Sequence, residues 1–267
     1  MPVIGFIGMG NMGKAMLQGA LTNFAPTEML FTCPTEAHRR SVEADTGVSS
    51  VESNAECANL AKYLVLAVKP QVYPKVLKNI QNVVRDEHVL ISLAPGITLE
   101  SIRESLGKPA RIVRAMPNTP ALVGQGMTGI SYRADELSFE EQDVIAKLFS
   151  SFGKYEKVEE KLMDAVVCAS GSSPAFVYMM IEALADGAVK QGLPRTQAYT
   201  MAAQAVKGSA EMVLRTGKHP AQLKDEVCSP GGTTIAGVAA LERTGFRNSL
   251  IQACDAVYEK SSSFSKG

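Results

Sequence analysis

Tryptophan is absent from this chain of 267 residues, and histidine occurs at three positions only. The histidines lie far apart, and the five cysteines are scattered without a CxxC pair, so no metal-ligand spacing is present. An odd number of widely spaced cysteines also favours reduced thiols over a disulfide framework. We therefore expect no metal site, and a cytoplasmic rather than a secreted protein.

An excess of charge of either sign is also lacking. The 27 lysines and arginines balance 27 aspartates and glutamates, and the only adjacent basic pair is Arg39-Arg40. A neutral chain without a basic stripe does not generate the field that holds nucleic acid or an acidic membrane surface. We expect neither nucleic acid nor membrane as a partner.

Long uninterrupted apolar runs are missing. The apolar stretch 165–181, which has no charged residue, contains Ser170-Gly171-Ser172-Ser173-Pro174. We expect this segment to interrupt the stretch and to exclude it as a membrane-spanning helix. The N-terminus has no basic segment before its apolar residues, which indicates a strand rather than a signal peptide. The sequence therefore predicts a soluble protein.

Strand-like and helix-like segments alternate in the first part of the chain, and residues 72–84 carry an apolar stripe of helical period. A further helix is expected at 138–151. Apolar runs rich in β-formers predict strands at 3–7, 29–32, 63–68, 88–93 and 111–115, with edge strands at 127–132 and 155–158. This alternation predicts an α/β domain over residues 1–160, with a Rossmann-type, doubly wound, mainly parallel sheet.

The pattern changes to helices alone after residue 160. We expect helices at 174–190, 196–214, 233–241 and 248–260, the first of them apolar almost all round. Residues 161–267 therefore form an all-helical second domain. Helices of this kind bury their extra apolar surface against a second subunit, so we expect a homo-oligomer, at least a dimer.

Three glycines follow the first expected strand in the segment Gly8-Met9-Gly10-Asn11-Met12-Gly13. In this GxGxxG pattern the first glycine makes the tight turn, the second lets a pyrophosphate approach the backbone, and the third allows close helix–strand packing. Free N–H groups and the helix dipole then face the phosphates. The motif predicts a dinucleotide site; a purely structural glycine turn is the alternative.

The preferred cofactor is indicated about 20 residues beyond the last glycine, where NAD-dependent enzymes carry an acidic residue for the ribose 2′-hydroxyl. Thr32 and Cys33 occupy that place, no acid follows them until Glu36, and Arg39-Arg40 lies just beyond. We therefore expect NADPH as the preferred cofactor, with NADH possible. The two arginines fit an exposed helix face equally well.

A second glycine segment, Ser229-Pro230-Gly231-Gly232-Thr233-Thr234, precedes an expected helix. Converging N–H groups at such a helix start form an anion nest, which could hold a substrate carboxylate. The segment 170–174 has the same pattern. For both segments the alternative is an ordinary helix cap with a loop glycine.

Taken together, these motifs resemble pyrroline-5-carboxylate reductase, the enzyme of the last step of proline synthesis. The resemblance runs in order through residues 7–13, 67–70, 114–120, 170–174, 223–225 and 229–234. It implies reduction of the cyclic imine 1-pyrroline-5-carboxylate to L-proline, and a helical domain that interlocks with its dimer mate, often within a decamer. Relatives commonly carry Ser, Asn or Arg where this chain has Cys33, so the resemblance says less about the cofactor preference than about the fold.

The resemblance also implies the site residues. Those expected at the cofactor are Ile7, Gly8, Met9, Gly10, Asn11, Met12, Gly13, Thr32, Cys33, Asn54, Ala67, Val68, Lys69, Pro70, Ala94, Pro95 and Gly96. Those expected at the substrate are Glu160, Ser229, Gly231, Gly232, Thr233 and Thr234.

Our hypothesis for catalysis is that Thr234 hydrogen-bonds the ring nitrogen and assists its protonation, while N–H groups of 231–234 fix the carboxylate. The alternative is that Thr234 only starts a helix. Two other functions remain open: a β-hydroxyacid dehydrogenase, for which Lys190 would be the catalytic lysine, and a non-catalytic NADP-binding sensor.

Overall fold

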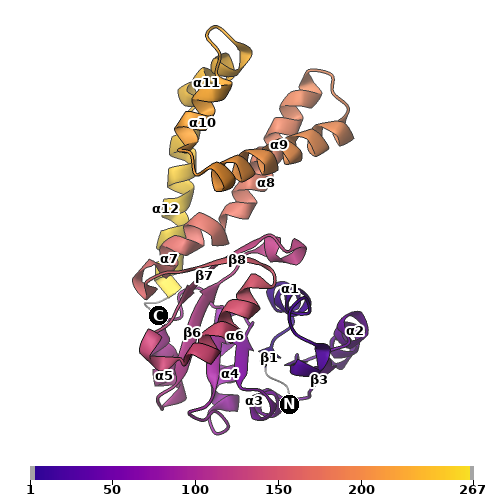
Figure 1. Cartoon of the computed structure of the whole chain (residues 1–267), viewed down its shortest axis with the longest axis vertical. Coiled ribbons are helices and arrows are strands. Elements are labelled where there is room, and N and C mark those ends of the chain that lie inside the picture. Colours follow the sequence, from indigo (N-terminus) through magenta and orange to yellow (C-terminus); the bar gives the residue numbers. More distant parts are fainter. Residues whose placement is uncertain (1–3, 265–267) are drawn as a thin grey trace. The chain divides into compact units, whose positions relative to one another are not determined.

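The computed structural model describes residues 4–264 and divides the chain into two compact units (Figure 1). The first unit comprises the residues up to 172 together with those from 257 on, and the second comprises 173–256. This division by compactness differs from the domain boundary expected at residue 160, which stays a prediction. Residue 3 of the expected first strand and residues 265–267 lie outside the described part.

An eight-stranded sheet forms the centre of the first unit, in the order β3-β2-β1-β4-β5-β6-β7-β8. All neighbouring strands are parallel except the antiparallel pair β6 and β7. The strands are β1 Ile4–Ile7, β2 Met29–Thr32, β3 Ser49–Ser50, β4 Tyr63–Leu66, β5 Val89–Ser92, β6 Arg111–Met116, β7 Gly126–Ser131 and β8 Gly153–Lys157. The strand order reverses between β1 and β4, which confirms the predicted doubly wound, mainly parallel sheet.

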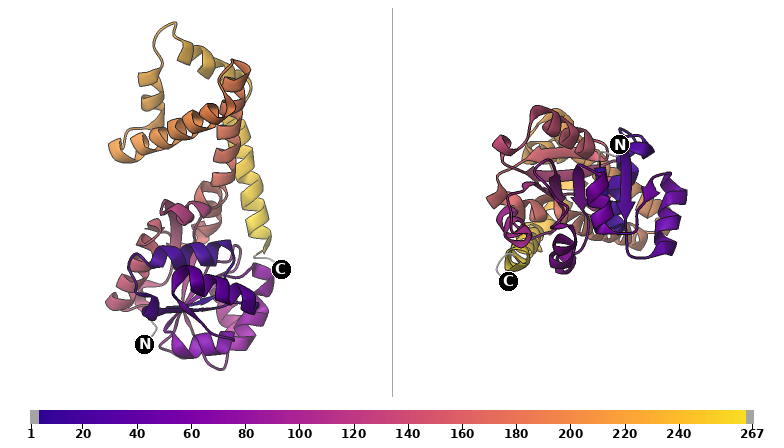
Figure 2. Two further views of the ribbon diagram at one scale, coloured as in Figure 1. Left: turned by 90° about the vertical axis from the view of Figure 1, so that its right-hand side faces the viewer. Right: turned by 90° about the horizontal axis from the view of Figure 1, so that it is seen from below.

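Helices cover both faces of this sheet because its central strands are apolar on both sides (Figure 2). Ile4 and Phe6 pack with α1 and α6 into one core, whereas Ile7 and Leu64 pack with α3, α4 and α5 into the other. The α-helices are α1 Asn11–Ala20, α2 Glu36–Thr46, α3 Asn54–Leu60, α4 Tyr73–Ile80, α5 Leu99–Leu106, α6 Phe139–Ser150 and α7 Met163–Val166. Short 3₁₀ turns occur at Pro26–Glu28, Pro70–Val72, Thr119–Val123, Ala134–Glu136 and Glu160–Leu162.

The second unit is helical, as predicted. Its helices are α8 Ser173–Lys190, α9 Arg195–Thr216, α10 Pro220–Val227, α11 Thr233–Arg243 and the first part of α12, Phe246–Phe264. The sequence patterns did not predict α10. Helices α8 and α9 pack against each other as a hairpin (Figure 1). Of residues 173–256, all of which the structure describes, only Ala185 and Ala198 are buried.

The segment 170–174 is not the open loop that its serines and glycine predicted. Val167–Gly171 forms a π-helical turn between α7 and α8, with the N–H of Ser172 donating to the carbonyl of Val167 at 2.8 Å. The wider turn places Pro174 near the start of α8, where a missing N–H is tolerated. The expected interruption of the apolar stretch is therefore wrong, and the expected glycine nest at this segment is absent.

Candidate active site

The first turn of α1 lies directly behind the end of β1, and its three glycines have different roles. At Gly8, where φ is +101°, a Cβ would lie 2.7 Å from the carbonyl oxygen of Ala67. At Gly13 a Cβ would overlap the carbonyl oxygen of Gly8. At Gly10 a Cβ would meet nothing within 4 Å. The fold itself requires Gly8 and Gly13, whereas Gly10 leaves open space in which a ligand can approach the backbone.

The N-terminus of α1 is also free of protein caps. Its N-cap is Gly10, no side chain accepts a hydrogen bond there, and the first turn contains no acidic residue. The start of α5, by contrast, is capped by Thr98, and that of α6 by Ser138. The first N–H groups of α1 and the positive end of its dipole therefore remain available to an anion, which fits a pyrophosphate.

A cavity of about 610 Å³ adjoins this helix start. It lies at the carboxyl ends of β4, β5 and β6, beside the reversal of strand order, where open α/β sheets bind their ligands. We call it the crevice. Its lining includes seven of the predicted cofactor residues, namely Gly10, Asn11, Met12, Ala67, Val68, Lys69 and Pro95. The volume is within the range of cofactor and small-ligand sites.

The other predicted cofactor residues do not line the crevice. Ile7, Met9, Gly13, Thr32, Cys33, Ala94 and Gly96 are buried, and Gly8, Asn54 and Pro70 are partly buried. Most of them belong to the strand ends and turns behind the crevice, so they support its shape. Their direct contact with a cofactor stays a prediction.

Tyr73 of α4 connects two of the strand ends that adjoin the crevice. Its buried hydroxyl donates to the carbonyl of Leu66 at 2.8 Å, accepts from the N–H of Leu93 at 3.1 Å, and bonds Ser92 at 3.0 Å. Burial raises the pKa of the Tyr73 phenol to about 12, so it remains a donor. One neutral side chain thus joins the ends of β4 and β5 just before the residues that line the crevice.

The end of β2 is the predicted ribose position. Burial raises the pKa of the Cys33 thiol, so the thiol is neutral and does not repel a phosphate. The Arg39 guanidinium donates to the carbonyl of Cys33 at 2.8 Å, which holds it at this strand end. Arg40 instead pairs with Glu36 on the exposed face of α2. The structure therefore separates two arginines that the sequence could not distinguish.

Glu160 lies elsewhere. Its Oε1 accepts the N–H of Leu99 at 2.7 Å and lies 3.7 Å from Nη1 of the buried Arg114. It thus caps α5 and lines a separate cavity of about 410 Å³ rather than the crevice. The structure does not bring Glu160 to the crevice, and its predicted contact with substrate stays a prediction.

The start of α11 in the second unit repeats the features of α1. Its N-cap is Gly232, no side chain caps it, and its first turn contains no acid. Gly231 has φ +68°, and the N–H of Gly232 donates to the carbonyl of Ser229 at 3.0 Å. Thr233 and Thr234 are exposed. The predicted anion nest therefore has free N–H groups and accessible hydroxyls.

Several lining residues were missing from the predicted cofactor set. They are Leu93, Met116, Pro117, Val167, Gly171 and Ser172. Met116 and Pro117 end β6, and this position at a strand end was the available signal. Val167 and Gly171 belong to the π-helical turn and Ser172 follows it; no local pattern indicates the place of this turn in the wall.

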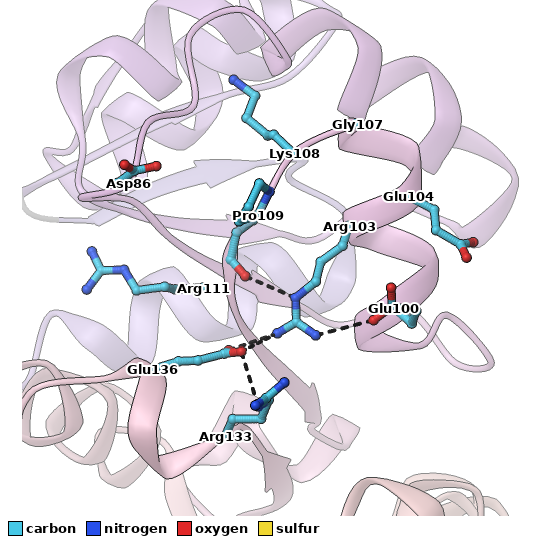
Figure 3. A pocket seen from close by; sticks show the side chains of 11 residues that line it. Asp86, Glu100, Arg103, Glu104, Gly107, Lys108, Pro109, Arg111, Arg133 and Glu136 are labelled. Atoms are coloured by element: carbon cyan, nitrogen blue, oxygen red, sulfur yellow. Dashed lines mark hydrogen bonds and ion pairs between the residues drawn. The ribbon is translucent and has the colours of Figure 1, made fainter.

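A larger cavity, of about 650 Å³, lies at the opposite end of β6 (Figure 3). Arg111 begins this strand and lines the cavity, whereas Met116 ends it and lines the crevice. Arg103 points to Glu136, with two bonds of 2.7 and 2.8 Å, and Arg133 pairs with the same glutamate. Acidic and basic lining residues are equal in number. The cavity therefore offers no net charge to an anionic cofactor, and residues 4–264 hold no cluster suited to a metal ion.

An uncapped glycine-loop helix at the strand-order reversal of a mainly parallel sheet defines a Rossmann-type dinucleotide-binding protein. Family models match both parts of the chain: "NADP oxidoreductase coenzyme F420-dependent" over residues 3–96 and "Pyrroline-5-carboxylate reductase dimerisation" over 160–264. The pyrroline-5-carboxylate reductase of Escherichia coli (strain K12) is 46% identical over 265 residues, covering 98% of both chains. That of Synechocystis is 45% identical over 266 residues, again covering 98% of both. The chain belongs to the pyrroline-5-carboxylate reductase family.

Solved structures agree with this assignment. The Plasmodium falciparum pyrroline carboxylate reductase with NADP bound has a TM-score of 0.89 at 33% identity, covering 99% of this chain and 98% of that one. The Coxiella burnetii reductase has a TM-score of 0.90 at 31% identity, covering 100% and 99%. A 3-hydroxyisobutyrate dehydrogenase from Salmonella typhimurium, at 12% identity and a TM-score of 0.58, shares the fold alone.

The helical run Glu160–Lys190 is apolar and long enough to cross a membrane, judged by length and composition only. Only 11% of its most apolar window is buried within the single chain. The same residues fall within the region that the dimerisation family model matches.

Proposed function

We propose that this protein reduces 1-pyrroline-5-carboxylate to L-proline with NADPH as hydride donor. The observation that carries the proposal is the pair of uncapped, glycine-started helices α1 and α11. The reaction needs two anionic reactants, a dinucleotide and a carboxylate, and a chain of zero net charge must bind them with local positive potential. The full-length similarity to reductases of this name supports the same activity.

In this proposal each helix start holds one reactant. The N–H groups at the start of α1 bind the pyrophosphate, and the crevice holds the rest of the dinucleotide; when bound, NADPH supplies the hydride. The N–H groups of Gly231, Thr233 and Thr234 fix the substrate carboxylate, while that of Gly232 donates to the Ser229 carbonyl. The hydroxyl of Thr234 donates a hydrogen bond to the ring nitrogen and assists its protonation, which makes the imine carbon more electrophilic.

Arg39 is the residue that we assign to the preference for NADPH. Its guanidinium is held at the end of β2 by the Cys33 carbonyl, where the adenosine ribose of a bound dinucleotide lies in Rossmann-type domains. No carboxylate precedes Glu36 in this segment. A 2′-phosphate would meet this cation, so kcat/KM should be higher with NADPH than with NADH.

The domain bounds, the cellular location and the oligomeric state are part of the same proposal. We place the cofactor domain at residues 1–160 and the helical domain at 161–267, and we propose a cytoplasmic homodimer, assembled into a decamer, without nucleic acid or membrane as partner. The few buried residues of the second unit support the dimer. The mass in solution, measured by light scattering, tests dimer against decamer.

Oxidation of NADPH in the presence of 1-pyrroline-5-carboxylate tests the activity. Turnover of the imine is expected, with a higher kcat/KM for NADPH than for NADH. Turnover of 3-hydroxyisobutyrate with NADP⁺ instead would favour the dehydrogenase, and NADPH binding with turnover of neither substrate would favour a sensor.

Thr234→Ala tests the proton role. We expect kcat/KM to fall at least tenfold, while Thr234→Ser, which keeps a hydroxyl, retains most of it. Thr244→Ala at the other end of α11 is the matched control, since its hydroxyl bonds the Ala240 carbonyl and it should leave activity unchanged. If Thr234→Ala changes kcat and kcat/KM less than threefold, about 0.7 kcal/mol, the proton role is wrong.

A further inference from the structure

Asn118 connects two segments beside the crevice through a buried side chain, which is 7% exposed. Its Oδ1 accepts the N–H of Met127 in β7 at 2.9 Å, and its Nδ2 donates to the carbonyl of Ser170 at 3.0 Å. A backbone donor on one side and a backbone acceptor on the other fix which amide atom faces which. Asn118 therefore joins the sheet to the π-helical turn Val167–Gly171.

The Ser170 carbonyl needs a donor for a reason visible in the sequence. In an α-helix it would accept the N–H of the residue four positions later. That residue is Pro174, which has no N–H. Residue 174 therefore cannot donate to this carbonyl, and the side chain of Asn118 supplies a donor.

The two ends of this connection adjoin the crevice. Gly171 and Ser172 directly follow Ser170, and Met116 and Pro117 directly precede Asn118; all four line the cavity. A Cβ on Gly171 would lie 3.6 Å from Cγ of Met116, so these two parts of the wall are in contact. The lining also includes Gly10 of the glycine loop.

We propose that Asn118 is a positioning residue for the hydride transfer. By donating to the Ser170 carbonyl, it sets the wall formed by Gly171 and Ser172 against the sheet, and this wall orients the reacting part of the dinucleotide. The inference rests on the proposed function of the crevice. Because a small misplacement of reactants slows a reaction far more than it weakens binding, Asn118 should act on kcat more than on NADPH affinity.

Asn118→Asp tests the amide N–H group separately from the amide oxygen. It keeps an acceptor for Met127 and loses the N–H group that faces Ser170. We expect kcat to fall at least tenfold, while the NADPH dissociation constant changes less than threefold because the start of α1 is untouched. Asn23→Asp is the matched control: Asn23 also joins two segments through its amide, to Lys147 and Ser151, but it does not line the crevice, and its variant should turn over normally.

Pro174→Ala provides a second, independent readout. It places a backbone N–H four residues after Ser170, so the loss caused by Asn118→Asp should be at least threefold smaller in this background. Equal losses in both backgrounds would overturn the proposal, as would a kcat of Asn118→Asp within threefold of the parent. If Asn118→Asp does not fold, Asn118→Ser, whose shorter side chain reaches Ser170 less well, is compared in the same two backgrounds.

The parent chain distinguishes this proposal from the proposed function. A folded parent without imine turnover overturns both. An active parent together with an unaffected Asn118→Asp overturns the positioning role alone.

Discussion

The two units of the chain differ in where their apolar side chains go. In the first unit the sheet has a core on each face, and large side chains such as Phe6, Phe31 and Phe149 are fully buried. In the second unit Met179 and Met201 are 68% and 63% exposed in the single chain, and only two alanines are buried. The first unit stabilises itself, whereas the second lacks a core of its own.

This difference separates two ways of building a site. The glycine loop of α1 is shaped by contacts within its own unit, because Gly8 and Gly13 pack against backbone atoms of that unit. In the glycine segment before α11, a Cβ on Gly232 would meet Ser229 of the same segment, whereas a Cβ on Gly231 would meet nothing within 4 Å. We therefore expect cofactor binding to depend on internal packing, and substrate binding to depend on assembly.

The largest expected effect comes from placing charge on the apolar surface of the second unit. The double variant Met179→Glu/Met201→Glu should shift the mass measured by light scattering to that of a monomer, because two buried, unpaired carboxylates would oppose association. Imine turnover should fall at least a hundredfold at micromolar protein.

Phe139→Glu is the control for this variant. Phe139 is 85% exposed and lies in the first unit, so its replacement should change neither mass nor turnover. A double variant that keeps the parental mass would show that these methionines do not contact another copy.

The next largest effect distinguishes the glycines of the first unit. Gly13→Ala forces a Cβ into the Gly8 carbonyl, and backbone atoms cannot move away as a flexible side chain can. We expect a loss of about 3 kcal/mol of unfolding free energy, which corresponds to roughly 6–12 °C in melting temperature.

Gly10→Ala should do the opposite. The backbone at Gly10, with φ −71° and ψ −173°, suits alanine, and its Cβ would point into open space. Melting should stay unchanged while the NADPH dissociation constant rises at least tenfold, as measured by fluorescence titration. Unchanged NADPH affinity would exclude this loop as the pyrophosphate site.

The sequence predicted the first unit well because each signal was local. Strands buried on both faces appear as continuous apolar runs, and the glycine loop lies between the first of them and its helix. The helices of the second unit were predicted from their apolar residues, although most of these residues are not buried in the single chain. The missed helix α10, Pro220–Val227, has only eight residues.

The sequence did not predict contacts between residues distant in the chain. Ser170 to Pro174 has strong local loop signals, yet the segment is helical, and the donor for the Ser170 carbonyl comes from Asn118, 52 positions away. The Leu99 N–H that Glu160 accepts is 61 positions away, and the expected contact of Glu160 with substrate stays a prediction. Local patterns cannot show such pairings.

The smallest expected effect tests the first unit through a buried ion pair at the base of its sheet. Glu141 of α6 is 5% exposed and pairs with Lys62 and Arg111, each at 2.7 Å. Burial opposes ionisation, but hydrogen bonds from Lys62, the Ser138 N–H and Arg111 outweigh it and lower the pKa of Glu141. Glu141→Gln should cost about 2 kcal/mol at pH 7, or roughly 4–8 °C in melting temperature.

The stabilisation by Glu141 should decrease as the pH falls. A carboxyl whose pKa is lower in the folded than in the unfolded state contributes stability above its ordinary pKa of 4.5 and loses it as the pH falls through the folded value. The difference in melting temperature between parent and Glu141→Gln should therefore shrink below pH 4.5, while Asp143→Asn, at an exposed position of the same helix, leaves melting unchanged throughout. A difference that stays constant down to the acid limit would mean that packing of the Glu141 side chain, rather than its charge, joins β4 and β6 to α6. The first unit would then be stabilised almost entirely by its two apolar cores, and its contrast with the second unit would be sharper still.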